Sequence, residues 1–210
     1  MNVFVGAPGR EFLGSSEVFI ILFVTFGPIN FIKLFYGMTK GVAAKALVGF
    51  SLRSALLATV AIVLSAFVGS FMLQKWEISV PAIALTGGII LFVAAMRSIL
   101  ALYGGSGPNA NAETPSPSVP NLVFPYIATP YGIAATIVLL TAAPESAMTI
   151  YMLLLAVMLI NLIMMLFVKP IMRVLGVPLG LLGTVLSVLQ VALSIQFVFF
   201  AIRTALAKGV

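Results

Sequence analysis

The sequence predicts an all-α integral membrane protein of about six transmembrane helices. We expect them to form two inverted three-helix repeats, with broken helices in spans one and four. The first observation is composition: 62% of the 210 residues are hydrophobic, only 8% are charged, and the mean hydropathy is +1.23. Because a soluble domain carries roughly 25% charged residues, this chain cannot cover a water-facing surface. The other two observations are a polar segment near the midpoint and helix-breaking motifs inside two apolar stretches.

Charged residues divide the chain into six apolar stretches, most of them near the length of about 20 residues that a transmembrane helix needs. They are residues 18–32, 54–73, 78–96, 121–143, 146–168 and 174–202. The first reaches full length only if it continues past Lys33 to Met38, which is acceptable if that lysine snorkels or lies at a break in the helix. No basic segment precedes an apolar stretch at the N-terminus, so we expect the first helix itself to direct insertion.

A segment rich in Gly, Pro and Ser divides the six stretches into two groups of three. It covers residues 104–120 (GGSGPNANAETPSPSVP) and is typical of a flexible linker. We therefore expect a first three-helix repeat over residues 1–103 and a second over residues 121–210. Because each half holds an odd number of spans, the second half must enter the membrane in the opposite orientation.

Basic residues near the ends of the spans predict the orientation. They follow spans one, three and five at Lys40, Lys45, Arg97, Lys169 and Arg173. The connections on the other side carry fewer basic residues and more balancing glutamates. By the positive-inside rule, the first set of connections lies in the cytoplasm and both termini lie outside.

Spans one and four each contain a helix-breaking motif near the middle. The motif is TFGPIN at residues 25–30 and IATPYG at residues 127–132. Proline removes an amide donor and clashes with the preceding turn, and an adjacent glycine permits conformations outside the helix. The backbone groups left unpaired must face protein, water or a bound ligand, because hydrocarbon cannot satisfy them.

Paired broken helices from inverted repeats form the midplane site of many secondary transporters, where half-helix N-termini face a carboxylate and free carbonyls face a cation or an amine. A lone proline would indicate a structural kink, whereas two at corresponding positions favour a function. We therefore predict that the two breaks form facing walls of one solute site. The wall residues in span one are Thr25, Gly27, Pro28 and Asn30, and those in span four are Thr129, Pro130, Tyr131 and Gly132.

Other polar side chains inside the spans have two interpretations each. Arg53 is a strongly basic residue within a hydrophobic stretch and is therefore a candidate site residue, but it also lies close enough to the span end to reach the interface. Asn161, Gln190 and Gln196 lie in spans five and six, where solute contact and interhelical hydrogen bonds explain them equally well. The small residues of span two and the glycine pair of span three indicate close helix packing.

The missing residue types limit the chemistry of the chain. It contains no His, Cys or Asp, so it lacks the usual nucleophilic triads, paired-aspartate sites, and haem or zinc ligands. A Ser/Lys arrangement remains formally open because Ser51 and Lys45 share a region. We expect no enzymatic activity, no cofactor and no metal centre. The Lys and Arg residues are spread among loops, so no nucleic-acid partner is expected.

The missing carboxylates also limit the choice of coupling ion. Every Glu lies in a loop or at a span end, so proton coupling would need Glu17 or a water-filled path. A Na⁺ ion, in contrast, could be held by carbonyl, Thr and Asn oxygens together with the carboxylate of the solute. The expected partners are a small-molecule solute, Na⁺ or H⁺ as a coupling ion, and the lipid bilayer.

Two segments resemble the MarC family of bacterial and archaeal membrane proteins. They are residues 55–100 (ALLATVAIVLSAFVGSFMLQKWEISVPAIALTGGIILFVAAMRSIL) and residues 121–140 (NLVFPYIATPYGIAATIVLL). The resemblance implies a six-helix protein of the inner (plasma) membrane, and members of the family are described as small neutral amino acid transporters. Many members have Gly-Pro-Gly in span four, where this chain has TPYG. A tyrosine at that position could narrow or cap a site.

The sequence thus predicts a multi-pass membrane transporter. Its solutes would be small neutral amino acids or similar small metabolites, moved by alternating access at the midplane site. Two alternatives stay open. One is an exporter of another small solute with lysine-exporter-like architecture, and the other is a non-transporting membrane partner protein.

Overall fold

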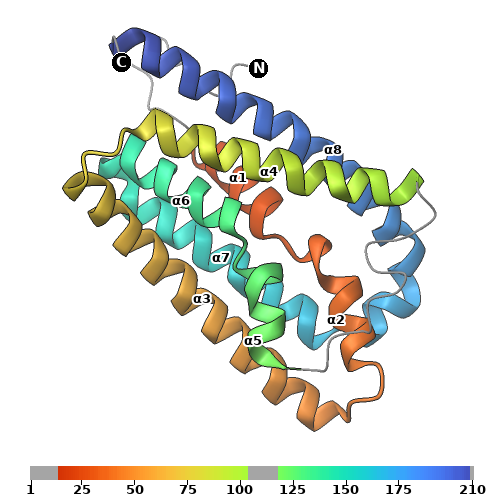
Figure 1. The fold of residues 1–210 in the computed structure, drawn as a ribbon. Helices are drawn as coiled ribbons and strands as arrows, with labels where there is room; N and C mark the ends of the chain where they lie inside the picture. Colours follow the sequence, from red (N-terminus) through yellow and green to blue (C-terminus); the bar gives the residue numbers. More distant parts are fainter. Residues whose placement is uncertain (1–13, 104–117, 209–210) are drawn as a thin grey trace.

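The computed structural model describes residues 14–103 and 118–208, and the regular structure in those two ranges is helical throughout (Figure 1). Four of the described helices are long and apolar enough to cross a membrane, over Ala44–Leu73, Val80–Leu100, Pro144–Leu166 and Pro178–Ala207. The predicted multi-pass, all-helical membrane protein is confirmed at this level. The predicted linker lies outside the described residues except at its end, where Val119 begins a helix.

The long helices are α3 (Ala44–Lys75), α4 (Val80–Tyr103), α7 (Ala147–Leu166) and α8 (Val168–Lys208). Two predicted boundaries were wrong. Span two was expected to begin at residue 54, but α3 begins at Ala44, and α8 includes the basic residues expected to form a loop after span five. Basic side chains end an apolar stretch but do not break a helix, since their long stems carry the charge to the interface.

Span one is broken, as predicted. It consists of α1 (Ser15–Phe26), the 3₁₀ turn η1 (Pro28–Asn30) and α2 (Ile32–Thr39). Gly27, between α1 and η1, is in an extended conformation (φ −63°, ψ 155°), the region favoured for a residue before proline. Lys33 lies just beyond the break in α2, with its side chain exposed.

Span four is also broken, as predicted. It begins with the short helix α5 (Val119–Leu122), continues as the π-helical turn η2 (Val123–Ile127) and resumes as α6 (Pro130–Ala142). The 3₁₀ turn η3 (Pro144–Ser146) then leads into α7. Thr129 is the N-cap of α6, where its side-chain oxygen accepts from the Gly132 N–H at 3.2 Å.

The two broken spans lie at the centre of the helical packing. α1 packs on α6 and α7, α6 also packs on α3 and α4, and α4 runs beside α8 on one side of the molecule (Figure 1). The largest fully buried side chains include Phe26, Phe31 and Phe35, all from span one. The outward faces of the long helices remain apolar, with Phe67 66% exposed, as expected where the surrounding solvent is lipid.

Small residues bring the helices close together, which confirms their interpretation as packing residues. A Cβ added to Gly69 of α3 would strike the Ile137 side chain of α6, and one added to Gly87 of α4 would lie 2.9 Å from the Cβ of Ala134. One added to Gly88 would lie 3.0 Å from the Ser194 carbonyl oxygen of α8.

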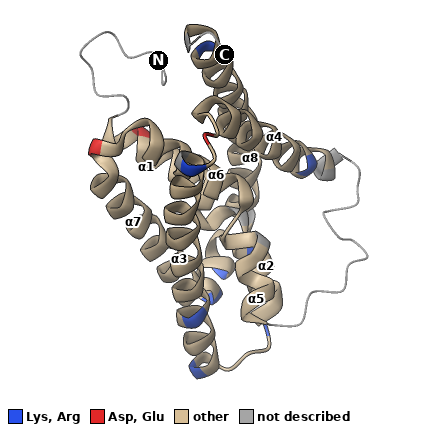
Figure 2. Ribbon diagram, turned by 60° about the vertical axis from the view of Figure 1, so that its left-hand side comes forward, with Lys and Arg blue, Asp and Glu red and all other residues tan. Residues whose placement is uncertain are grey.

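Charged residues gather at the ends of the helices (Figure 2). The described acidic residues lie toward the end where α1 begins, whereas the opposite end, where α2 leads into α3, carries basic residues. At that basic end the Lys169 Nζ donates to the Val42 carbonyl oxygen at 2.7 Å, joining the α7–α8 junction to the α2–α3 loop. These two connections therefore lie on the same side, in agreement with the prediction from the basic residues.

Candidate functional site

The structure brings the two predicted walls into direct contact. The Thr129 Oγ1 lies 3.4 Å from the Thr25 carbonyl oxygen, to which it donates. Beside this bond the ring of Phe26 packs on the backbone of Gly132, so closely that a Cβ on Gly132 would lie 2.6 Å from the Phe26 Cζ. We call this contact, between residues 24–26 of α1 and residues 129–132 of span four, the crossing.

Side chains at and around the crossing donate to three consecutive carbonyls at the end of α1. In an unbroken helix the Val24 carbonyl would accept from residue 28, but Pro28 has no N–H. The Gln190 Nε2 of α8 donates to the Val24 carbonyl oxygen at 2.8 Å instead. The Asn161 Nδ2 of α7 donates to the Phe26 carbonyl oxygen, also at 2.8 Å.

Thr129, which donates to the Thr25 carbonyl, completes this set of three donors. The donors come from three different spans. All three donor residues are deeply buried, with exposed fractions of 5% for Gln190, 4% for Thr129 and 1% for Asn161. In a bilayer interior, unpaired carbonyls would be costly, and these side chains supply each of the three with a hydrogen-bond donor. Asn161 and Gln190 therefore form interhelical hydrogen bonds, one of the two roles predicted for them, and they do so at the crossing itself.

Helix ends of opposite polarity meet at the crossing. α1 ends there, which places about half a negative charge beside its last carbonyls, and α6 begins there, which places about half a positive charge beside its first amides. A small molecule that carries one positive and one negative charge could contact both helix ends. The arrangement is suited to a zwitterion more than to a simple anion or cation.

Several predicted residues contribute in a different way from the one expected. The Thr25 hydroxyl donates back to the Ile21 carbonyl oxygen at 2.9 Å, so it is the Thr25 carbonyl that faces span four. Gly27 and Pro28 are buried where α1 ends. Asn30 ends η1, but its side chain lies outside the described part of the structure.

The remaining predicted residues lie farther from the crossing or at its edge. Pro130 begins α6 with an exposed ring, and Tyr131 next to it is half-buried. Arg53 is exposed on α3, and the structure does not bring it to the other site residues.

Sequence reasoning missed Phe26 as a site residue. It lies inside the TFGPIN motif and is only 1% exposed, but only polar, Gly and Pro residues of the motif were selected. An aromatic residue beside a break carries no signal that distinguishes it from an ordinary core residue. Its role becomes visible only through its contact with Gly132.

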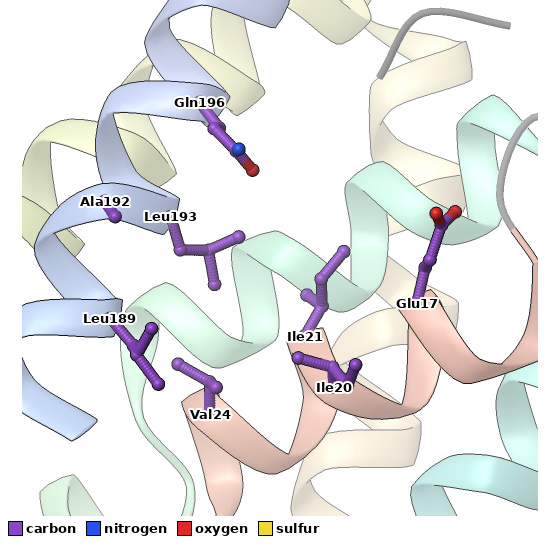
Figure 3. Close-up of a pocket in the computed structure, with 8 residues that line it drawn as sticks. All are labelled: Glu17, Ile20, Ile21, Val24, Leu189, Ala192, Leu193 and Gln196. Atoms are coloured by element: carbon purple, nitrogen blue, oxygen red, sulfur yellow. The ribbon is translucent and has the colours of Figure 1, made fainter. Parts of the chain in front are cut away.

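Two cavities lie near α1, one between α1 and α8 and the other beyond the break. The first has a volume of about 180 Å³ between α1 and α8, and Figure 3 shows Gln196 directed into it and the Glu17 carboxylate at its far end. Its lining residues are Glu17, Ile20, Ile21, Val24, Leu189, Ala192, Leu193 and Gln196. The Glu17 carboxylate also accepts from the Gly14 N–H at 3.2 Å.

The second cavity, of about 200 Å³, lies beyond the break and has an apolar lining. It is bounded by Pro28 and Ile29 of η1 and by Pro178, a proline inside α8. α7 closes it with Ile160 and Met164. Both cavities are smaller than the range of about 300–1,000 Å³ typical of pockets for drug-sized ligands.

Comparisons with known proteins agree on one family. A family model described as MarC family integral membrane protein matches residues 14–206. A UPF0056 membrane protein of Archaeoglobus fulgidus is 24% identical over 191 residues, covering 86% of this chain and 88% of the relative. The UPF0056 membrane protein YhcE of Escherichia coli is 30% identical over 127 residues, covering 58% of this chain and 59% of the relative. No solved structure matches the chain.

Proposed function

The chain belongs to the MarC family of integral membrane proteins, and from that premise we propose that it is a transporter in the inner (plasma) membrane. Its solutes are small neutral amino acids or similar small metabolites, which it moves by alternating access at the crossing. The observation that carries the proposal is the set of three carbonyls at the end of α1, held by side chains of three other spans. A protein with only a structural role in the membrane would not need an interrupted backbone at its centre.

The packing pattern supports two inverted repeats. Exchanging spans one, two and three with spans four, five and six maps the contact of α1 with α7 onto that of α6 with α3. It also maps the contact of α4 with α6 onto the contact of α8 with span one. The contact of α3 with α7 and the contact of α4 with α8 each map onto themselves. Such a relation gives the two orientations that alternating access requires.

The cavities and the helix ends support a small zwitterionic solute. Each cavity has room only for a small molecule. The opposed ends of α1 and α6 complement an ammonium and a carboxylate. In this conformation the Phe26 ring and the Thr129 hydrogen bond hold the two walls of the crossing together, so solute binding between the walls requires the crossing to open.

Flux measurements in proteoliposomes test the proposal. The wild-type chain should give saturable uptake of labelled glycine or alanine, and Pro28→Ala should reduce it at least tenfold because it supplies an N–H that lets α1 continue through the break. Pro144→Ala, at an exposed proline in η3, is the matched control and should leave flux unchanged.

The same experiment separates the two alternatives. A lysine-exporter-like protein would move another solute in a panel tested in both directions. A non-transporting partner protein would show no saturable flux for any solute and would co-purify with another protein. Unchanged flux in Pro28→Ala would exclude the crossing as the transport site.

A further inference from the structure

One side-chain oxygen at the crossing is buried without a hydrogen-bond partner. The Asn161 Nδ2 donates to the Phe26 carbonyl oxygen and lies 3.8 Å from the Met158 Sδ, while the Asn161 Oδ1 has no partner. The residue is 1% exposed, so bulk water does not reach it. The other described side-chain atoms in this condition are the hydroxyls of Ser51 and Ser54 on α3, and Asn161 alone among them is bonded to the crossing.

The amide that carries this oxygen contacts the neutral acceptors at the end of α1. This amide donates to the carbonyl oxygen of Phe26, the last residue of α1. The Thr25 carbonyl precedes it, and the break begins at the next residue, Gly27. A carbonyl oxygen has two lone pairs, so each of the two carbonyls can accept a further partner beside the donor it already has. The 3.4 Å contact from Thr129 is long for an O–H···O bond, which makes the Thr25 carbonyl the more available of the two.

We propose that the Asn161 Oδ1 and the last carbonyls of α1 bind a small monovalent cationic group, either the ammonium of a zwitterionic solute or Na⁺. The proposal rests on the proposed function, because it assigns one end of the transported solute, or its coupling ion, to a named part of the crossing. It makes Asn161 a binding residue, beyond its role as a donor to α1.

The chemistry of the acceptors selects this class of ligand. Carbonyl and amide oxygens are neutral, and the partial negative charge of a helix C-terminus favours a cation there. The described residues contain no group of His, Cys, Asp or Glu that could hold a metal ion, so a divalent or transition metal would lack the charged or soft ligands it needs. A proton has no acceptor with a suitable pKa among these amide and carbonyl groups.

Thermal unfolding of the purified full-length chain in detergent tests the site without any transport assay. A ligand that binds only the folded chain raises its Tm in a saturable way. The probes, at constant ionic strength, are NaCl, methylammonium chloride and glycine, with choline chloride as the bulky control cation. A shift with NaCl identifies Na⁺, and a shift with methylammonium or with glycine in Na⁺-free buffer identifies an ammonium. Either result supports the proposal.

Two leucine variants form the matched pair. Asn161→Leu and Gln190→Leu each remove one 2.8 Å amide hydrogen bond to the end of α1, but only the first removes the unpartnered oxygen. Asn161→Leu should raise the half-saturating concentration of the responding probe at least tenfold, and Gln190→Leu should change it less than threefold. Absence of a response in the wild type, persistence of the response in Asn161→Leu, or equal loss in both variants would overturn the proposal.

Asn161→Asp keeps the test decisive if the leucine variant does not fold. It keeps an oxygen at the same position but exchanges the Nδ2 donor for a second oxygen, so raising the pH until the carboxyl group is ionised should lower the half-saturating concentration of the cation at least tenfold. An unchanged concentration would contradict a cation site. A Tm response without solute flux would refute the transport function and leave the cation site standing. Solute flux without a Tm response would refute the cation site and leave the transport function standing.

Discussion

Gly132→Ala should destabilise the protein by forcing the two broken helices apart at the crossing. The added Cβ would lie 2.6 Å from the Phe26 Cζ and 2.7 Å from the Thr129 Oγ1, both shorter than the 3.0 Å that real Cβ contacts respect. Phe26 is 1% exposed and packed in the core, so its ring has no free space into which to move. The backbones must therefore separate.

The magnitude follows from three effects. Overpacking a well-packed core costs about 1–3 kcal/mol. Weakening the two hydrogen bonds of the Thr129 hydroxyl adds about 0.5–1.5 kcal/mol for each bond lost, whereas alanine in place of glycine within a helix returns about 0.5–1 kcal/mol. With both bonds lost, we expect the free energy of unfolding to fall by about 1–5 kcal/mol, measured by denaturant titration in mixed micelles.

Gly49→Ala is the matched control, because Gly49 lies on α3 with no atom within 4 Å of an added Cβ. It should be neutral or stabilise the protein by up to about 1 kcal/mol. A Phe26→Leu substitution should relieve part of the Gly132→Ala defect, giving a coupling energy of at least about 0.5 kcal/mol in a double-mutant cycle. Equal stability of Gly132→Ala and Gly49→Ala, or no coupling in the cycle, would mean that the Phe26–Gly132 contact does not limit how closely the two spans pack.

Three further predictions concern the hydrogen bonds and the orientation. Thr129→Val keeps the side-chain shape but removes the cap of α6 and the bond across the crossing, so the free energy of unfolding should fall by about 1–2 kcal/mol in the same titration, and no change would refute this role. Lys169→Met removes the 2.7 Å hydrogen bond to the Val42 carbonyl and should lower the free energy of unfolding by about 1 kcal/mol. An unchanged free energy of unfolding would mean that this loop contact does not stabilise the protein. Because the chain has no Cys, a single cysteine reports its side of the membrane. Glu145→Cys should react with an impermeant maleimide on intact cells and Gly41→Cys only after permeabilisation, and the opposite pattern would invert the orientation.

The broken helices were predictable because proline acts locally. Pro28 removes one donor and excludes one backbone conformation, whatever surrounds it, so the end of α1 can be placed from the sequence. The boundaries of α3 and α8 were less predictable, since Arg53, Lys169 and Arg173 mark the edge of hydrophobicity and not the end of a helix. Periodicity and charge describe burial in lipid, while helix ends depend on backbone chemistry.

The partners of the broken backbone could not be predicted, because they are fixed by long-range packing. Gln190 lies 166 residues from the carbonyl it caps, and Asn161 lies 135 residues from its own. The sequence marks each as a polar residue in an apolar span but contains no signal for which carbonyl it meets. Phe26 carried even less signal, because it is apolar in an apolar helix and its role depends on Gly132 in another span.

A structure of the full chain with its transported solute bound would show whether the crossing is the transport site. We expect solute density at the crossing, with a cationic group at the Thr25 and Phe26 carbonyls beside Asn161 and with the Phe26 ring displaced from Gly132. Density confined to the cavity between α1 and α8, with the crossing still closed, would contradict it.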